Sequence, residues 1–202
     1  MAQSGVDARY NLAVINWFNE EGSRFAPSMM GSSVFTGVLA LSDAQSVTDL
    51  AGVTVAQAQE EAGWAPREEA PTLAAYAEIH VEQGKELEAA GNTIGLVTAT
   101  WGARKFQAVV SGEQGHTGST LMADRRDALF GASLIISAVQ RLTREFPEGK
   151  LQASVSQLTL EPNSPVTIAR EVRFNVDLRS PSSEVLSQAQ EKLLSLIHIS
   201  EP

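Results

Sequence analysis

The chain has 202 residues, of which 43% are hydrophobic, so it is long and apolar enough for a packed core and lacks the composition of a disordered protein. Its 24 acidic residues outnumber its 15 basic ones, and the formal charge of −9 argues against a nucleic-acid partner. The absence of cysteine excludes disulfides and cysteine nucleophiles, so the protein ligands of any metal must be His, Asp or Glu.

The first predicted element is a strand over residues 11–18, NLAVINWF, whose nearly continuous apolar run is typical of a strand buried on both faces of a parallel sheet. It leads directly into the pair Glu20-Glu21. Further on, a helix is expected over residues 54–62, because Thr54 can cap its start and Gly63 can end it.

After a polar loop over residues 64–71, two more strands are predicted at residues 74–81 and 93–100. Between them, a short helix is expected over residues 85–90, ending at Gly91. Alternating strands and helices of this kind predict an α/β layer with a mostly parallel sheet.

The pattern changes near Trp101, which we take as a domain boundary between residues 1–100 and 101–195. The predicted elements of the second part are strand 105–111, helix 124–146, strand 151–160, strand 166–178 and helix 183–194. They amount to a ferredoxin-like βαββαβ unit that lacks its last strand. In the long helix, one apolar stripe is expected to pack on the sheet: Leu129, Ala132, Ile135, Ile136, Val139 and Leu142.

Two adjacent carboxylates at the end of a buried strand stand where open α/β sheets place their ligand sites. Because neighbouring strand residues point in opposite directions, one of Glu20 and Glu21 could bind a divalent cation while the other accepts a proton from water. The alternative is that both side chains are simply solvated in a surface loop.

Three further residues are candidates for the same chemistry, each with a structural alternative. His80 lies in an apolar strand, near the polar run Glu82-Gln83-Gly84, and is either a metal ligand or a hydrogen-bonded core residue. His116 lies in a glycine-rich loop and either contacts a substrate or is exposed in a turn. Arg179 can pair with a substrate carboxylate or with Asp177.

Three long segments together resemble the family of N-carbamoyl-amino-acid hydrolases and allantoate amidohydrolases: NEEGSRFAPSMMGSSVFTG, AEIHVEQGKELEAAGNTIGLVT and GHTGSTLMADRRDAL. The resemblance covers about residues 5–195. It implies a di-metal catalytic domain, interrupted by a smaller lid domain that also forms a homodimer.

The resemblance also implies a role for each candidate residue. Glu20 resembles the general base, while Glu21 and His80 resemble ligands of a pair of divalent ions, which could be Zn, Mn, Ni or Co. Substrate-binding positions are matched by Gln83, His116 and Arg179. The implied reaction is attack of a metal-activated water on the carbonyl of an N-carbamoyl amino acid or ureido acid such as allantoate.

The chain departs from the family pattern in three respects. No counterpart of the remaining metal ligands is present, so the sequence predicts an incomplete site. In EPNSPVTIAREVRF, the family's Asn and Pro-Gly are replaced by Val166, Ala169 and Arg170. The last seven residues, LIHISEP, match neither the preceding helix nor the expected strand, and residues 196–202 are interpreted as a non-native tail.

The sequence therefore predicts part of a metal-dependent amidohydrolase that cleaves non-peptide carbon–nitrogen bonds. The alternatives are an aminoacylase or dipeptidase of the same clan, and an inactive fragment that retains only dimerisation through the lid. Neither an apolar run of about 20 residues nor a secretion signal is present, so we expect no membrane association and a cytoplasmic location.

Overall fold

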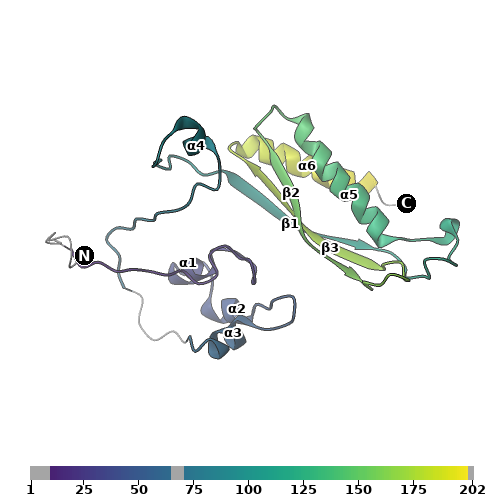
Figure 1. The fold of residues 1–202 in the computed structure, drawn as a ribbon, viewed down its shortest axis with the longest axis horizontal. Helices are drawn as coiled ribbons and strands as arrows, with labels where there is room; N and C mark the ends of the chain where they lie inside the picture. The colour runs from purple at the N-terminus through teal and green to yellow at the C-terminus, as the bar shows by residue number, and fades with distance from the viewer. Residues whose placement is uncertain (1–9, 65–70, 200–202) are drawn as a thin grey trace. The chain divides into compact units, whose positions relative to one another are not determined.

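Three short helices gather around a small apolar core in the first part of the chain. The computed structural model describes residues 10–64 and 71–199, and it divides into two compact units, residues 1–81 and 82–202 (Figure 1). The described helices of the first unit are α1 (Met30–Phe35), α2 (Leu41–Ser46) and α3 (Val55–Glu61). Their core consists of four buried side chains: Phe25, Met30, Ala44 and Val55.

The helix predicted at residues 54–62 is confirmed in detail. Thr54 accepts a hydrogen bond from the backbone N–H of Gln57, and the Gln57 side chain accepts one from the backbone of Thr54. This reciprocal pair satisfies backbone donors at the start of α3, and Gly63 adopts a positive φ just beyond its end. Helices α1 and α2 were not predicted, because six-residue segments rich in serine carry little periodicity.

The three strands predicted at residues 11–18, 74–81 and 93–100 are wrong as hydrogen-bonded strands. None of these segments forms a ladder in the described part of the chain, and their apolar side chains are largely exposed, including Val14 (101%), Ile79 (103%) and Leu96 (90%). A strand needs a neighbour to accept and donate its backbone hydrogen bonds, and apolar periodicity does not supply that neighbour.

The second unit is an antiparallel sheet with two helices on one face (Figure 1). After α4 (Glu86–Ala90) come β1 (Gly102–Ser111), α5 (Ala128–Leu142), β2 (Gln152–Glu161), β3 (Glu171–Ser180) and α6 (Ser183–Ile199). The strand order is β1-β3-β2, with β3 antiparallel to both neighbours. This order of elements is the one predicted for the incomplete ferredoxin-like unit.

Alternation along β3 separates the two faces of this sheet. The side chains that face the helices are buried: Val172, Phe174, Val176 and Leu178. They pack with a stripe of α5 that consists of Ala128, Ala132, Ile135, Val139 and Leu142. The predicted stripe was wrong at Leu129, which is 44% exposed. The helix begins later than expected, with Asp127 capping the N–H groups of Leu129 and Phe130.

Both ends of the predicted β3 and the end of the predicted α6 also shifted. The backbone of residues 166–170 pairs mainly with the loop between β1 and α5, while β2 contributes one hydrogen bond, from the Arg170 N–H to the Glu161 carbonyl. The strand β3 therefore begins at Glu171 instead of residue 166. The backbone helix of α6 continues to Ile199, past its predicted end at residue 194. In the described ranges, no helix has the length and apolar character required to cross a membrane.

Candidate metal centre

The loop that carries Glu20 and Glu21 is shaped by the residue before them. Asn19 adopts the left-handed conformation with φ 48°, which asparagine tolerates better than most residues. Its side-chain amide donates to the carbonyls of Phe25 at 2.8 Å and Pro27 at 3.1 Å. The Glu20 carbonyl accepts from the Met29 N–H at 2.6 Å. The loop is thus closed on itself immediately beside the two carboxylates.

Two glycines are required by this closure. Gly22 has φ +70°, and a Cβ there would lie 2.8 Å from the Ser28 Cα. A Cβ on Gly31 would lie 2.8 Å from the Phe18 backbone nitrogen, because the first turn of α1 packs directly against the chain leading to the Glu pair. Close backbone approach of this kind accepts only glycine without local rearrangement.

An ion pair between Arg24 and Asp49 fixes the loop that follows the Glu pair. Arg24 Nε donates to Asp49 Oδ2 at 2.9 Å, and the Arg24 guanidinium lies 4.9 Å from the centre of the Phe25 ring. Asp49 Oδ1 also accepts from the N–H groups of Ala51 and Val53, both at 2.9 Å. The Arg24 hydrogen bond, together with these backbone donors, lowers the pKa of Asp49 below its ordinary 3.8.

We expect Asp49→Asn to reduce thermal stability at neutral pH and to have little effect in acid. Because folding lowers the pKa of Asp49, its contribution is present above pH 3.8 and is lost as the pH falls through the folded-state pKa. The measurement is Tm of the two proteins between pH 7 and pH 2, with Arg24→Gln as a comparison that removes the strongest cause of the shift. A difference in Tm that stayed constant over this range would contradict the assignment.

His80 approaches the Glu pair from the other segment of the first unit. Its Nε2 lies 4.0 Å from Glu21 Oε1, and ligand atoms of Glu20, Glu21 and His80 all lie within 4.8 Å of one another. The Nδ1–H donates to the carbonyl of Val81 at 2.5 Å, since a carbonyl can only accept. This tautomer leaves the Nε2 lone pair on the side of the carboxylates, as a metal ligand requires.

The electrostatics of His80 follow from these neighbours. The hydrogen bond to Val81 raises the pKa of His80 above its ordinary 6.5, and the negative charges of Glu21, Glu78 and Glu20 raise it further. Three groups of the hard and borderline donor types that bind Zn²⁺ or Mn²⁺ therefore converge at one point, and this donor set fits a divalent cation.

The two segments that carry these residues run in the same direction. Trp17 Nε1–H donates to the Tyr76 hydroxyl at 2.9 Å, across a sequence separation of 59 residues. The contact between Glu21 and His80 has the same sequence separation. Two contacts with one offset indicate a parallel register, although no backbone ladder joins the segments in the described chain.

Sequence reasoning missed Tyr76 and Trp17. Tyr76 donates to Glu78 Oε2 at 2.5 Å, and this hydrogen bond raises the pKa of the Tyr76 phenol. The available signal was the spacing of Tyr76, Glu78 and His80, which puts alternate residues on one face of an extended segment.

Gln83 and His116 belong to the second unit. Gln83 lies just before α4 and has a left-handed backbone with φ 56°. The Nδ1 atom of His116 accepts from the N–H groups of Gly118 at 3.0 Å and Ser119 at 3.2 Å. In the neutral ring the proton is therefore on Nε2, which makes His116 a hydrogen-bond donor in the direction of that atom.

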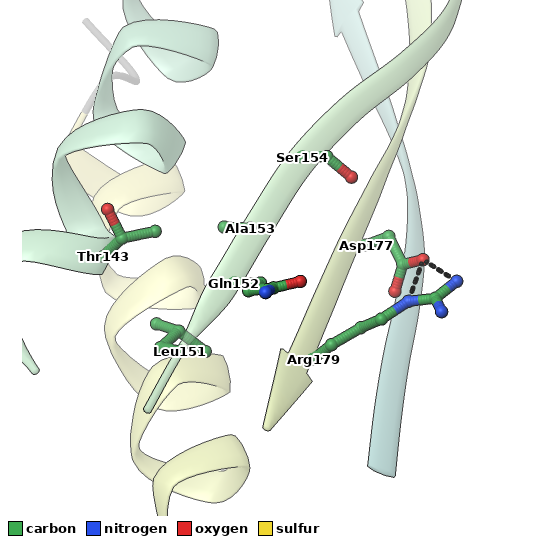
Figure 2. A pocket seen from close by; sticks show the side chains of 7 residues that line it. All are labelled: Thr143, Leu151, Gln152, Ala153, Ser154, Asp177 and Arg179. Atoms are coloured by element: carbon green, nitrogen blue, oxygen red, sulfur yellow. Dashed lines mark hydrogen bonds and ion pairs between the residues drawn. The ribbon is translucent and has the colours of Figure 1, made fainter. Parts of the chain in front are cut away.

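Arg179 lies near the end of β3 and forms the ion pair with Asp177 that was its structural alternative. Its Nε and Nη2 atoms lie 3.0 and 2.9 Å from Asp177 Oδ2. Figure 2 shows both side chains at a cavity of about 520 Å³. The other lining residues are Thr143, Leu151, Gln152, Ala153 and Ser154. Arg179 is half-exposed, so it can still reach an anionic ligand beside the cavity.

The structure does not bring His116 and Arg179 together within this unit. His116 forms a β-bridge with Thr167, before the start of β3, whereas Arg179 lies near the other end of the same strand. A ten-residue strand spans about 30 Å at roughly 3.3 Å per residue. One copy of this unit therefore cannot bring both side chains to one small substrate.

The residues that depart from the family pattern support the loop of His116. The backbone of residues 166–170 exchanges hydrogen bonds with residues 112–117. The Arg170 guanidinium donates to Gln114 at 2.8 Å and pairs with Glu161. Arg170 thus connects this loop to the end of β2. Val166 is 56% exposed and has no side-chain amide with which to bind a substrate.

Comparison with known proteins finds no matching family model, but it finds relatives over almost the whole chain. The chain is 52% identical to a hydrolase of Mycolicibacterium smegmatis, across 96% of this chain and 45% of that protein. It is 36% identical to the N-carbamoyl-L-amino-acid amidohydrolase of Rhizobium meliloti, across 96% of this chain and 47% of the relative. The allantoate amidohydrolase of Bacillus subtilis is 34% identical, with corresponding shares of 93% and 46%.

A solved structure has the same fold over most of the chain. The amidase of the hydantoinase/carbamoylase family from Burkholderia vietnamiensis matches with a TM-score of 0.84 and 37% identity, over 91% of this chain and 45% of that one. The chain thus spans about half the length of the curated relatives it matches.

Proposed function

We infer that this chain, a homologue of the N-carbamoyl-L-amino-acid and allantoate amidohydrolases, carries part of the metal centre of an enzyme that hydrolyses non-peptide carbon–nitrogen bonds. The observation that carries the proposal is the convergence of Glu20, Glu21 and His80 within 4.8 Å. Because the chain covers about half of its relatives, the activity is proposed for the full-length gene product.

In the proposed mechanism, the two carboxylates have separate roles. Glu21 and His80 hold a divalent cation, since these two groups face each other and the Nε2 lone pair of His80 is directed to the cluster. Glu20 accepts the proton of the attacking water and passes it to the departing nitrogen. When bound, the pair of divalent cations supplies Lewis-acid activation of water and substrate.

The substrate is proposed to be an N-carbamoyl amino acid or a ureido acid such as allantoate. Arg179 suits its carboxylate, because a guanidinium can form two parallel hydrogen bonds with such a group. The Nε2–H of His116 suits the oxygen that becomes negative when water adds to the ureido carbonyl. Gln83, three residues after His80 in the sequence, offers a side-chain amide as a further hydrogen-bonding group for the substrate.

The separation of His116 and Arg179 along β3 supports the proposed homodimer. If both groups bind one substrate, they must come from different copies of the chain, because one copy holds them about 30 Å apart. The antiparallel sheet and its two helices are the part of the chain proposed to form this contact, as the lid domain.

The test is hydrolysis by the full-length protein of two substrate classes after loading with Zn²⁺ or Mn²⁺. We expect ammonia release from N-carbamoyl amino acids or allantoate, and much slower cleavage of N-acyl amino acids and dipeptides. The reverse preference would favour an aminoacylase or dipeptidase. Turnover that survived removal of all divalent metal would contradict the proposal.

A further inference from the structure

A chain of side-chain hydrogen bonds crosses between the two segments that carry the metal-binding residues. The Tyr76 hydroxyl accepts from the Trp17 indole N–H at 2.9 Å and donates to Glu78 Oε2 at 2.5 Å. Trp17 lies three residues before Glu20, and Tyr76 lies four residues before His80. The Tyr76 hydroxyl thus joins the two segments a few residues before the candidate ligands of each segment.

The Trp17 end of this connection is fixed by packing. The Trp17 ring meets the Phe35 ring edge to face, with centroids 5.4 Å apart and planes at 72°, and Phe35 is the last residue of α1. The first turn of α1 in turn donates from the Gly31 N–H to the Phe18 carbonyl at 2.9 Å. Helix α1, Trp17 and the Glu pair therefore form one connected piece, to which Tyr76 attaches the second segment.

The Glu78 end has a different consequence. Alternation places Glu78 and His80 on one face of their segment, so a third carboxylate is available beside the cluster. Yet the described convergence contains Glu20, Glu21 and His80, while Glu78 Oε2 is bound to the Tyr76 hydroxyl. The Tyr76 hydroxyl thereby binds the Glu78 carboxylate, which would otherwise compete with Glu20 and Glu21 for the His80 imidazole.

We propose that Tyr76 is a positioning residue, which holds His80 opposite the Glu20–Glu21 pair by tying its segment to Trp17 and by retaining Glu78. The positioning depends on the contacts above, and its effect on metal binding rests on the proposed function. No backbone ladder joins the two segments in the described chain, so this side-chain bridge is what sets their register four residues before the ligands.

The first experiment measures the register directly. The chain has no cysteine, so nitroxide labels can be placed at Val14→Cys and Ile79→Cys, whose native side chains are fully exposed at 101% and 103%. Pulsed dipolar spectroscopy should give a narrow distance distribution in the otherwise native chain. Tyr76→Phe, which removes only the hydroxyl, should at least double its width, and Trp17→Phe should do the same.

The chain provides a matched control, because its only other tyrosine is Tyr10, which is 79% exposed. Tyr10→Phe makes the identical chemical change outside the bridge and should leave the distribution narrow. If Tyr76→Phe gives the same distribution as Tyr10→Phe, the positioning role is overturned. Circular dichroism of each variant separates a change of register from a loss of helices.

The second experiment tests the effect on the metal centre by titrating the full-length protein with Mn²⁺. Trp17→Phe should weaken binding roughly 3- to 10-fold, the range for one neutral hydrogen bond, and Tyr76→Phe should weaken it at least as much, because it also releases Glu78. The double variant should bind no more weakly than Tyr76→Phe alone, because Trp17→Phe breaks a bridge that Tyr76→Phe has already broken. If the two losses multiply, each ring acts separately and the bridge is not the cause. Absence of Mn²⁺ binding in the unsubstituted protein contradicts the proposed function, while the nitroxide distances still decide the positioning.

Discussion

Replacing Glu20 with Gln should reduce turnover of the full-length protein by about 10²- to 10⁴-fold, the range for loss of a general base. The amide has nearly the same size as the carboxylate, so the loop closed by Asn19 and Gly22 should keep its shape. It cannot accept a proton from water. The expected loss is therefore in kcat, with the metal content of the protein unchanged.

The measurement combines steady-state kinetics on an N-carbamoyl amino acid with metal analysis of the purified protein. Glu60→Gln is the matched control, since Glu60 is an exposed carboxylate in α3 of the same unit. It should retain native turnover. Full activity of the Glu20→Gln protein would remove Glu20 from the mechanism, whereas loss of metal together with turnover would make it a ligand instead of the base.

His80→Ala should remove the metal itself, with affinity at least about 100-fold weaker, because it deletes one of the two proposed ligands and leaves Glu21 without a nitrogen donor beside it. Metal content after dialysis, together with competition against a chelator, measures the change. His116→Ala is the comparison, as it removes an imidazole from the second unit. It should slow turnover while metal content stays native.

The pH dependence of metal binding provides a further outcome for His80. Its pKa is raised by the hydrogen bond to Val81 and by Glu21, Glu78 and Glu20, so its ring takes up a proton at a higher pH than an ordinary imidazole. Protons and metal compete for Nε2. As the pH is lowered, the affinity for the metal should therefore begin to fall while the pH is still above 6.5. A decline that began only well below that pH would contradict this account.

Local signals predicted the helices with recognisable caps and the antiparallel unit. Thr54 and Gln57 form the capping box expected from their spacing, and Gly91 ends α4 in the left-handed conformation. The alternation of β3 and the stripe on α5 needed only the neighbouring elements of the same unit, so their burial followed from periodicity. The helix α5 begins at Ala128 instead of the predicted residue 124, because Asp127 supplies its cap.

Prediction failed for the apolar runs at residues 11–18, 74–81 and 93–100. Their composition is that of buried parallel strands, but a strand exists only when another chain segment accepts and donates its backbone hydrogen bonds. The described chain supplies no such ladder, and Val14 and Ile79 remain exposed. The parallel register of the two segments is visible only in side-chain contacts, one between Trp17 and Tyr76 and one between Glu21 and His80.

The amino-acid sequence by itself determined the donor types of the candidate centre and their motifs, because carboxylates and imidazoles are the metal ligands left to a chain without cysteine. Only the tertiary structure decided that Glu20, Glu21 and His80 meet, that Tyr76 joins their segments, and that His116 and Arg179 lie at opposite ends of β3. The physical reason is separation along the sequence. Residues 59 positions apart come together through long-range packing, which no local pattern encodes.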